Sequence, residues 1–111
     1  MTATHQPEAA AVSAAERLYT VLAAIPAGTV VTYGQLAALA GFPRRARWVG
    51  QMLQRLPEGS RLPWHRVINA QGRSSFPSDS PAYARQLQLL RAEGVAISPS
   101  RRIALQRHGL N

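Results

Sequence analysis

The sequence contains neither cysteine nor lysine, and both absences restrict what its 111 residues can do. Without a thiol there is no disulfide, no thiolate nucleophile and no Cys-based metal site, and no residue cluster calls for a cofactor. An apolar run long enough to cross a bilayer and a start of signal-peptide type are also missing. We therefore expect a soluble, cytoplasmic protein that binds no metal and no membrane.

Acidic residues are scarce as well, with 5 against 13 arginines and a formal net charge of +8. This balance favours a polyanionic partner. Residues 44–73 contain seven of the arginines and a single acidic residue, Glu58. A planar guanidinium suits phosphates and base edges, although an arginine- and alanine-rich chain is also typical of a GC-rich genome. Nucleic-acid binding is the favoured interpretation, and a merely solvated basic face is the alternative.

The length fits one domain, which we place at residues 13–111 after a flexible tail at 1–12. Ser13 and Glu16 have the spacing of a capping box that opens a first helix. A second box, Thr32 and Gln35, opens another helix, which we expect to end before Gly41.

A third helix is predicted from Pro43, with an inner face of Val49, Met52, Leu53 and Leu56. Two helices joined by a tight glycine-containing turn make a helix-turn-helix. The opposite face of the third helix carries Arg44, Arg47, Trp48, Gln51 and Arg55.

The second half of the chain predicts a loop, a helix and a short wing. Residues 69–80 are polar and read as a loop, after which Ser80 and Pro81 begin a helix that stops at Gly94. Val95 and Ile97 then alternate as a strand or wing. The coarse prediction is one mainly helical domain.

The most informative stretch is Pro63-Trp64-His65-Arg66-Val67. It resembles the active-site motif Pro-Cys-His-Arg-Val of the O6-alkylguanine-DNA alkyltransferases, and further similar segments lie in the family's order along the chain, at 28–37 and 46–50 before the motif and at 89–94 after it. The tryptophan variant resembles the alkyltransferase-like proteins, which bind alkylated DNA without transferring the alkyl group. The resemblance implies a winged helix-turn-helix-like domain similar to the C-terminal DNA-binding domain of the alkyltransferases.

Several departures from the enzymes concern catalysis, and we expect no catalytic residue. Trp64 replaces the alkyl acceptor, and an indole is not a useful nucleophile. By resemblance, His65 and Glu93 match the pair that polarises the cysteine in the enzymes. Here we expect them to maintain the structure of the site and to activate no nucleophile. Leu56 stands where the enzymes have an asparagine beside the active site.

By the same resemblance, the third helix enters the minor groove of DNA. Arg47 would fill the gap left by an extruded nucleotide, or contact a phosphate, and Tyr33 would press on the backbone and rotate the nucleotide outward, or simply pack. The role of Trp48, which replaces a family alanine, stays open. The predicted DNA-binding set is Tyr33, Arg44, Arg45, Arg47, Trp48, Gln51 and Arg55.

The pocket for the damaged base is expected under the loop at 69–78, with Tyr33, Trp64, Arg73 and Ser78 around it. The function implied is that of a monomer that flips O6-alkylguanine out of duplex DNA and marks it for nucleotide excision repair proteins. Two alternatives remain, a winged-helix transcriptional regulator and residual hydrolysis through His65 and Glu93. The regulator would need a dimerisation surface, which the sequence does not reveal.

Overall fold

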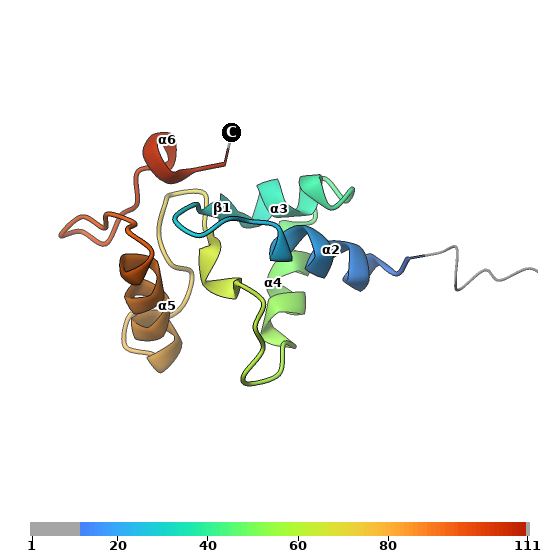
Figure 1. Cartoon of the computed structure of the whole chain (residues 1–111), viewed down its shortest axis with the longest axis horizontal. Coiled ribbons are helices and arrows are strands. Elements are labelled where there is room, and N and C mark those ends of the chain that lie inside the picture. Colours follow the sequence, from blue (N-terminus) through green and yellow to red (C-terminus); the bar gives the residue numbers. More distant parts are fainter. Residues whose placement is uncertain (1–11, 111) are drawn as a thin grey trace, which may run out of the picture.

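The computed structural model describes residues 12–110, so the predicted tail at 1–12 lies almost wholly outside the described residues. Figure 1 shows a mainly helical arrangement with a small two-stranded sheet between the helices, which confirms the predicted fold class. No helix in this range is long and apolar enough to span a membrane. The elements are α2 (Ala14–Ala23), β1 (Val31–Thr32), α3 (Tyr33–Leu39), α4 (Ala46–Gln54), the 3-10 helix η1 (Trp64–Arg66), β2 (Val67–Ile68), α5 (Pro81–Ala92) and α6 (Leu105–His108).

Both predicted capping boxes form. The Ser13 hydroxyl accepts from the Glu16 amide, the Glu16 side chain accepts from the Ser13 amide, and Thr32 and Gln35 repeat this pairing at the start of α3. Gly41 follows α3 with φ 94°, a left-handed conformation that glycine adopts without strain.

The third predicted helix starts later than the sequence indicates. We expected it to begin at Pro43, but α4 begins at Ala46, with Arg45 as its N-cap. The reason is the turn itself: Arg44 has φ 67°, which is incompatible with a right-handed helix, so helical geometry starts only beyond it. Arg44 and Arg45 therefore lie on the turn before α4 and not on the helix.

The two strands join distant parts of the chain. β1 pairs with β2 in parallel, with Val31 opposite Val67 and Thr32 opposite Ile68. Because the two strands run in parallel, the start of α3 after β1 lies beside the loop that follows β2, which places Tyr33 next to Asn69. The sequence assigned no strand to residues 67–68.

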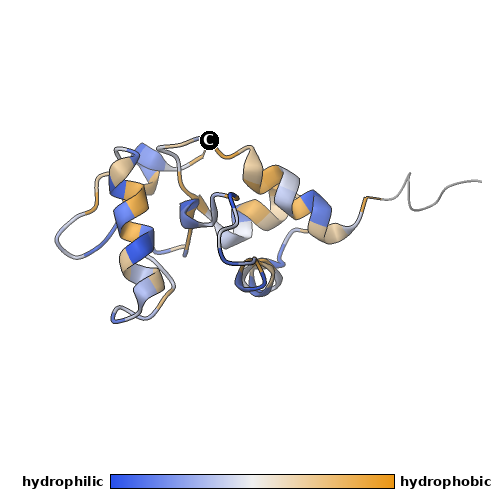
Figure 2. Ribbon diagram, turned by 60° about the horizontal axis from the view of Figure 1, so that its bottom comes forward, coloured by the Kyte–Doolittle hydropathy of each residue, from blue (hydrophilic) through white to orange (hydrophobic). Residues whose placement is uncertain are grey.

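Two groups of buried apolar residues stabilise this arrangement. The larger one joins α2, α3, α4 and the sheet, and the smaller one joins the sheet and α5 to the C-terminal segment through Val30, Ile68, Leu90, Val95 and Ile103. Figure 2 shows the helices as mixed apolar and polar ribbons, as expected for helices buried on one face only.

The predicted wing is a small hairpin beyond α5. Ile97 pairs with Ile103 in an antiparallel bridge, and Val30 pairs with Gly109 in a parallel one. The segment after Ser98 thus forms α6 and then returns to the edge of the sheet at Gly109. In Figure 1 the hairpin projects at the left, at the opposite end of the molecule from α2.

Candidate nucleic-acid interface

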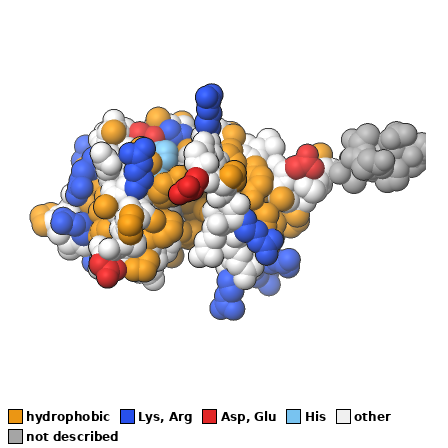
Figure 3. Space-filling view, turned by 90° about the horizontal axis from the view of Figure 1, so that it is seen from below, with side chains coloured by type: hydrophobic (Ala, Val, Ile, Leu, Met, Phe, Trp, Pro, Cys, Tyr) orange, Lys and Arg blue, Asp and Glu red, His pale blue; other side chains and the backbone are white. Residues whose placement is uncertain are grey.

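A cleft of about 1200 Å³ lies between the second half of the helix-turn-helix and the remainder of the domain. Residues of α4 and residues 56–62 line one part of it. The other part is lined by η1, residues 75–77 and one face of α5. Figure 3 shows the molecule from below, with arginine side chains spread over a surface on which acidic side chains are few.

Trp64 forms an aromatic wall of this cleft. It opens η1, and its half-buried indole meets the Phe76 ring nearly edge-on, with 5.8 Å between centroids and 89° between planes. The His65 ring lies on another side at 6.0 Å. Such edge-to-face contacts hold aromatic rings in a defined orientation.

Tyr33 and Arg47 lie at the edge where α3 and α4 meet the cleft. The Tyr33 hydroxyl forms a 2.6 Å hydrogen bond with the Ser75 hydroxyl, which links α3 to the loop that follows β2. Gly50 faces the Tyr33 ring, and an added Cβ there would come to 3.9 Å from it. A small residue at position 50 therefore allows the Tyr33 ring to pack against α4.

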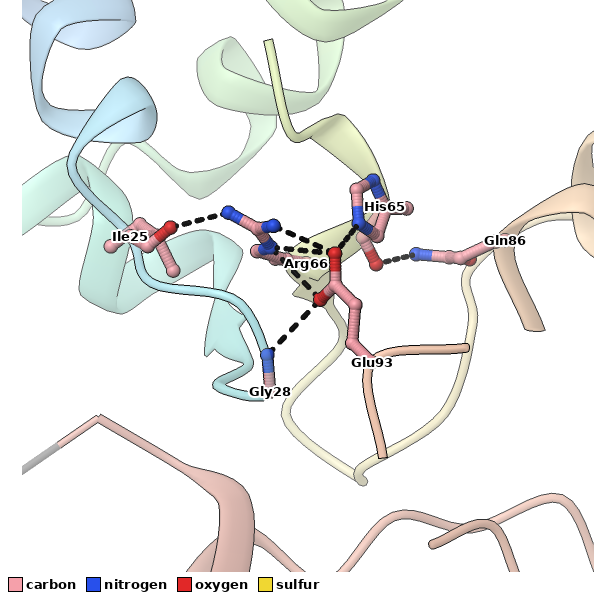
Figure 4. Close-up of polar contacts among 6 residues, drawn as sticks. All are labelled: Ile25, Gly28, His65, Arg66, Gln86 and Glu93. Atoms are coloured by element: carbon pink, nitrogen blue, oxygen red, sulfur yellow. Dashed lines mark hydrogen bonds and ion pairs between the residues drawn. The ribbon is translucent and has the colours of Figure 1, made fainter. Parts of the chain in front are cut away.

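Beneath Trp64, a polar network centres on Glu93 (Figure 4). The carboxylate accepts hydrogen bonds from Arg66 at 2.7–3.2 Å and from the Gly28 amide at 3.1 Å, and its Oε2 lies 2.7 Å from His65 Nε2. Arg66 also donates to the Ile25 carbonyl at 2.6 Å. The network thus ties the end of α5 to η1 and to the segment between α2 and β1.

This network keeps Glu93 ionised. Burial alone would raise the pKa of its carboxyl, but the hydrogen bonds from Arg66, His65 and Gly28 outweigh burial and lower the pKa from 4.5 to about 2. The predicted pairing of His65 with Glu93 is present. Sequence reasoning missed Arg66, which supplies the charge opposite Glu93, although its place beside His65 in the motif was a signal.

A second residue missed from sequence is Gln86, which is fully buried on α5. Its amide nitrogen donates to the carbonyls of His65 and Val67 at 3.1 and 2.9 Å. These bonds satisfy one backbone carbonyl of η1 and one of β2, so Gln86 helps to fix the backbone next to Trp64.

The predicted DNA-binding residues lie in two different environments. Trp48 is half-buried, packs against the main core and meets Phe42 edge-on at 5.1 Å, which gives it a packing role. The exposed members of the set are Arg44, Arg45, Arg47, Gln51 and Arg55. Of these, Arg47 and Gln51 also line the cleft.

Of the residues predicted around the base pocket, Tyr33 and Trp64 line the cleft, whereas Arg73 and Ser78 do not. The Asn69 side chain accepts from the Arg73 amide and closes residues 69–73 into a tight turn, of which Asn69 lines the cleft and Arg73 does not. The loop instead lines the cleft with Ser75, Phe76 and Pro77. An aromatic residue in an otherwise polar loop was the available signal for Phe76.

The charges of this region remain largely uncompensated within the described range. Ion pairs there are limited to Glu93 with Arg66 and His65, so the exposed arginines of the α3–α4 turn and of α4 have no acidic partner among residues 12–110. Exposed arginines that form no ion pair with an acid attract phosphate groups.

Comparison with known proteins agrees with this geometry. Residues 13–95 match the family described as 6-O-methylguanine DNA methyltransferase, DNA binding domain. The chain is 54% identical over 96 residues to the DNA base-flipping protein of Escherichia coli, covering 86% of this chain and 73% of that protein. It is 42% identical over 81 residues to alkyltransferase-like protein 1 of Schizosaccharomyces pombe, covering 73% and 75%.

Solved structures show the same similarity. The S. pombe Atl1 complex with damaged DNA containing O6-carboxymethylguanine superposes with a TM-score of 0.80 at 35% identity, over 88% of this chain and 94% of that one. The Mycobacterium tuberculosis OGT complex with DNA gives 0.64 at 31% identity, over 85% and 54%. The resemblance seen in the sequence is confirmed, and the chain belongs to the family of the 6-O-methylguanine DNA methyltransferase DNA-binding domain.

Proposed function

We propose that this protein binds duplex DNA containing O6-alkylguanine, flips the modified nucleotide into the Trp64 cleft and leaves the alkyl group in place. The observation that carries this proposal is the cleft itself. An aromatic wall of Trp64 and Phe76 stands beside Tyr33 and Arg47, which lie at the edge that joins the cleft to the helix-turn-helix. The names of the similar relatives, a DNA base-flipping protein and an alkyltransferase-like protein, support the same function.

In the proposed complex, α4 docks against the minor groove. Exposed Arg44, Arg45 and Arg55 supply contacts to phosphates, which give affinity without regard to sequence. Arg47 inserts into the base stack and Tyr33 presses on the backbone, since flipping costs a few kcal/mol that only such contacts offset. Ser75, bonded to Tyr33 in the unbound protein, must release the hydroxyl if Tyr33 is to contact DNA.

The flipped base would stack against aromatic and apolar walls, as in other base-flipping pockets. Trp64 offers such a surface, and Phe76 fixes its orientation. An apolar wall also favours an alkylated O6 over a bare carbonyl oxygen, because the carbonyl would lose hydrogen bonds to water on burial.

We further propose that binding is not followed by alkyl transfer. Transfer requires a polarisable, deprotonated nucleophile, and the chain contains no cysteine. Trp64 has no such atom, and Glu93, bonded to both His65 and Arg66, serves to hold η1 in position. The residual-hydrolysis alternative has less support, because the Glu93 carboxylate already binds His65, Arg66 and the Gly28 amide.

Binding without repair can only mark a lesion, so we keep nucleotide excision repair proteins as the proposed next partner. The monomeric state, the cytoplasmic location and residues 13–111 as a single functional unit are likewise proposals. The transcriptional regulator is not favoured, because the relatives are named for base flipping and alkyltransferase likeness.

The experiment compares two duplexes that differ only in one O6-methylguanine. Fluorescence anisotropy at moderate salt measures the affinity for each, and mass spectrometry of protein and DNA after incubation follows the methyl group. We expect a clear preference for the modified duplex, no methylated protein and no loss of O6-methylguanine.

Three other results would contradict the proposal. Equal affinity for the two duplexes would remove lesion recognition, and preference for one unmodified sequence would indicate a regulator. Methyl transferred to protein, or lost from DNA over time, would indicate an enzyme.

A further inference from the structure

The C-terminal hairpin carries two arginines that the proposed function does not use. Ile97 and Ile103 pair across it, the Ser98 amide donates to the Arg102 carbonyl at 2.9 Å, and the Arg101 amide donates to the Ser98 carbonyl at 2.8 Å. Arg101 and Arg102 are both exposed at its tip. The hairpin lies beyond residues 13–95, the part that matches the family.

The hairpin is bonded to the turn that leads into the cleft loop. Arg102 Nε donates to the Gln71 carbonyl at 3.1 Å, and the Ile103 amide donates to the Gly72 carbonyl at 2.7 Å. Arg73, also exposed, follows in the same turn. Two segments about thirty residues apart therefore bring Arg73, Arg101 and Arg102 to one corner of the molecule, called here the basic corner.

The same turn borders the helix-turn-helix. A shallow second depression is lined by Tyr33 and Arg47 on one side and by Asn69 and Ala70 on the other. Residues 69–71 thus run without a break from the edge of the proposed DNA-binding surface to the carbonyl that accepts from Arg102. The basic corner therefore adjoins the edge of the proposed DNA-binding surface through residues 69–71.

The conformation of Arg101 indicates that its side chain has a use beyond the fold. Its φ is 65°, and the one other non-glycine residue of the described chain with positive φ is Arg44, on the turn before α4. Glycine would adopt this conformation without strain. The Arg101 guanidinium makes only a 3.5 Å contact with the Pro99 carbonyl, and no ion pair joins the basic corner to an acid within residues 12–110.

We propose that Arg73, Arg101 and Arg102 form a second phosphate-binding surface that contacts the backbone of the bound duplex beside the flipped nucleotide. This inference rests on the proposed function only in assuming that duplex DNA is the ligand. Phosphate contacts carry no base information, so the basic corner adds equally to the affinity for modified and unmodified DNA.

The test uses substitutions at Arg101. Arg101→Gly removes the charge and suits the positive φ, whereas Arg101→Lys keeps the charge in the same conformation. Arg91→Gln is a matched control, because Arg91 is an exposed arginine in the last turn of α5, outside both arginine surfaces. Affinity is measured over a salt series with the unmodified and the O6-methylguanine duplexes, and thermal unfolding shows that each variant folds.

We expect Arg101→Gly to reduce the magnitude of the slope of log affinity against log salt by about 0.9, which is the value for one lost phosphate contact. The reduction should be the same on both duplexes. Arg101→Lys and Arg91→Gln should keep the wild-type slope. In the double variant Arg101→Gly/Arg102→Gln the magnitude of the slope should fall by about 1.8. A neutral methylphosphonate at the contacted position should weaken the wild type but not Arg101→Gly.

An unchanged slope in folded Arg101→Gly overturns the proposal and leaves the corner for a partner other than DNA. An equal loss in Arg91→Gln overturns it too, because the effect would then be one of net charge. Failure of the proposed function is a separate outcome: the wild type would show no lesion preference, while its salt slope would still report the phosphate contacts.

Discussion

Replacing Glu93 with Gln tests whether the ionised network beneath Trp64 holds the domain together. The substitution keeps the shape of the side chain but removes the charge that Arg66 and His65 face at 2.7 Å. A pKa of about 2 against the ordinary 4.5 corresponds to about 3 kcal/mol, at about 1.4 kcal/mol per pH unit. Because the Glu93 side chain is 16% exposed, solvent screening lowers our expectation to about 2 kcal/mol.

The pH dependence has a definite sign. A carboxyl whose pKa is lower in the folded state stabilises the fold above the unfolded pKa, 4.5, and this contribution is lost as the pH falls towards about 2. The difference in unfolding free energy between wild type and Glu93→Gln should therefore be constant from pH 7 to about 5.5 and shrink steadily below 4.5. Titratable sites that do not contact Glu93 cancel in this difference.

Urea denaturation at a series of pH values, followed by circular dichroism, measures this difference. Glu16→Gln is a suitable control, since Glu16 is exposed at the start of α2 and takes part only in the local capping box. A difference for Glu93→Gln that stays the same from pH 7 to pH 2.5, or that is zero at pH 7, would refute the assigned role of the Glu93 charge.

Three further predictions concern the cleft and its supports. Arg47→Ala should reduce the preference for O6-methylguanine about tenfold and general affinity about threefold, as anisotropy on paired duplexes would show. Trp64→Cys should acquire little or no methyl transfer, because Leu56 and the altered loop leave the pocket unsuited to it; stoichiometric methylation in the mass spectrum would disprove this. Gly72→Ala should lower the free energy of unfolding, measured by urea titration, by at least about 1–2 kcal/mol. The reason is that the φ of Gly72 is 81° and that an added Cβ would come to 2.5 Å from the Ile103 carbonyl oxygen. Unchanged stability would count against this tight contact.

The sequence predicted the local features well, because they depend on neighbours a few residues apart. Ser13 and Thr32 cap helices through side chains three positions from their partners, and Ser80 with Pro81 starts α5 in the same way. The start of α4 was the exception. Nothing local announces that Arg44 turns left-handed, a conformation that is unfavourable for arginine by itself.

The site divides in the same manner. The absence of cysteine and the Trp64 motif led from sequence alone to a family and to a protein without an alkyl acceptor. They did not predict Phe76 as the support of Trp64, Gln86 as the bond donor beneath it, or the turn that takes Arg73 out of the cleft. Each of these depends on a contact with a residue far away or on the path of an irregular loop.

Composition, motif and capping pattern thus indicated the class of fold, the polyanionic partner and the absence of a thiol, since these follow from residue identity and short spacing. Only the tertiary structure decided which side chains share the cleft, how Glu93 stays charged, and that the hairpin arginines meet the cleft loop. The parallel pairing of Val31 with Val67 and the bonds of residues 71–72 to 102–103 create those neighbours, and such long-range contacts are chosen by the packing of the whole chain.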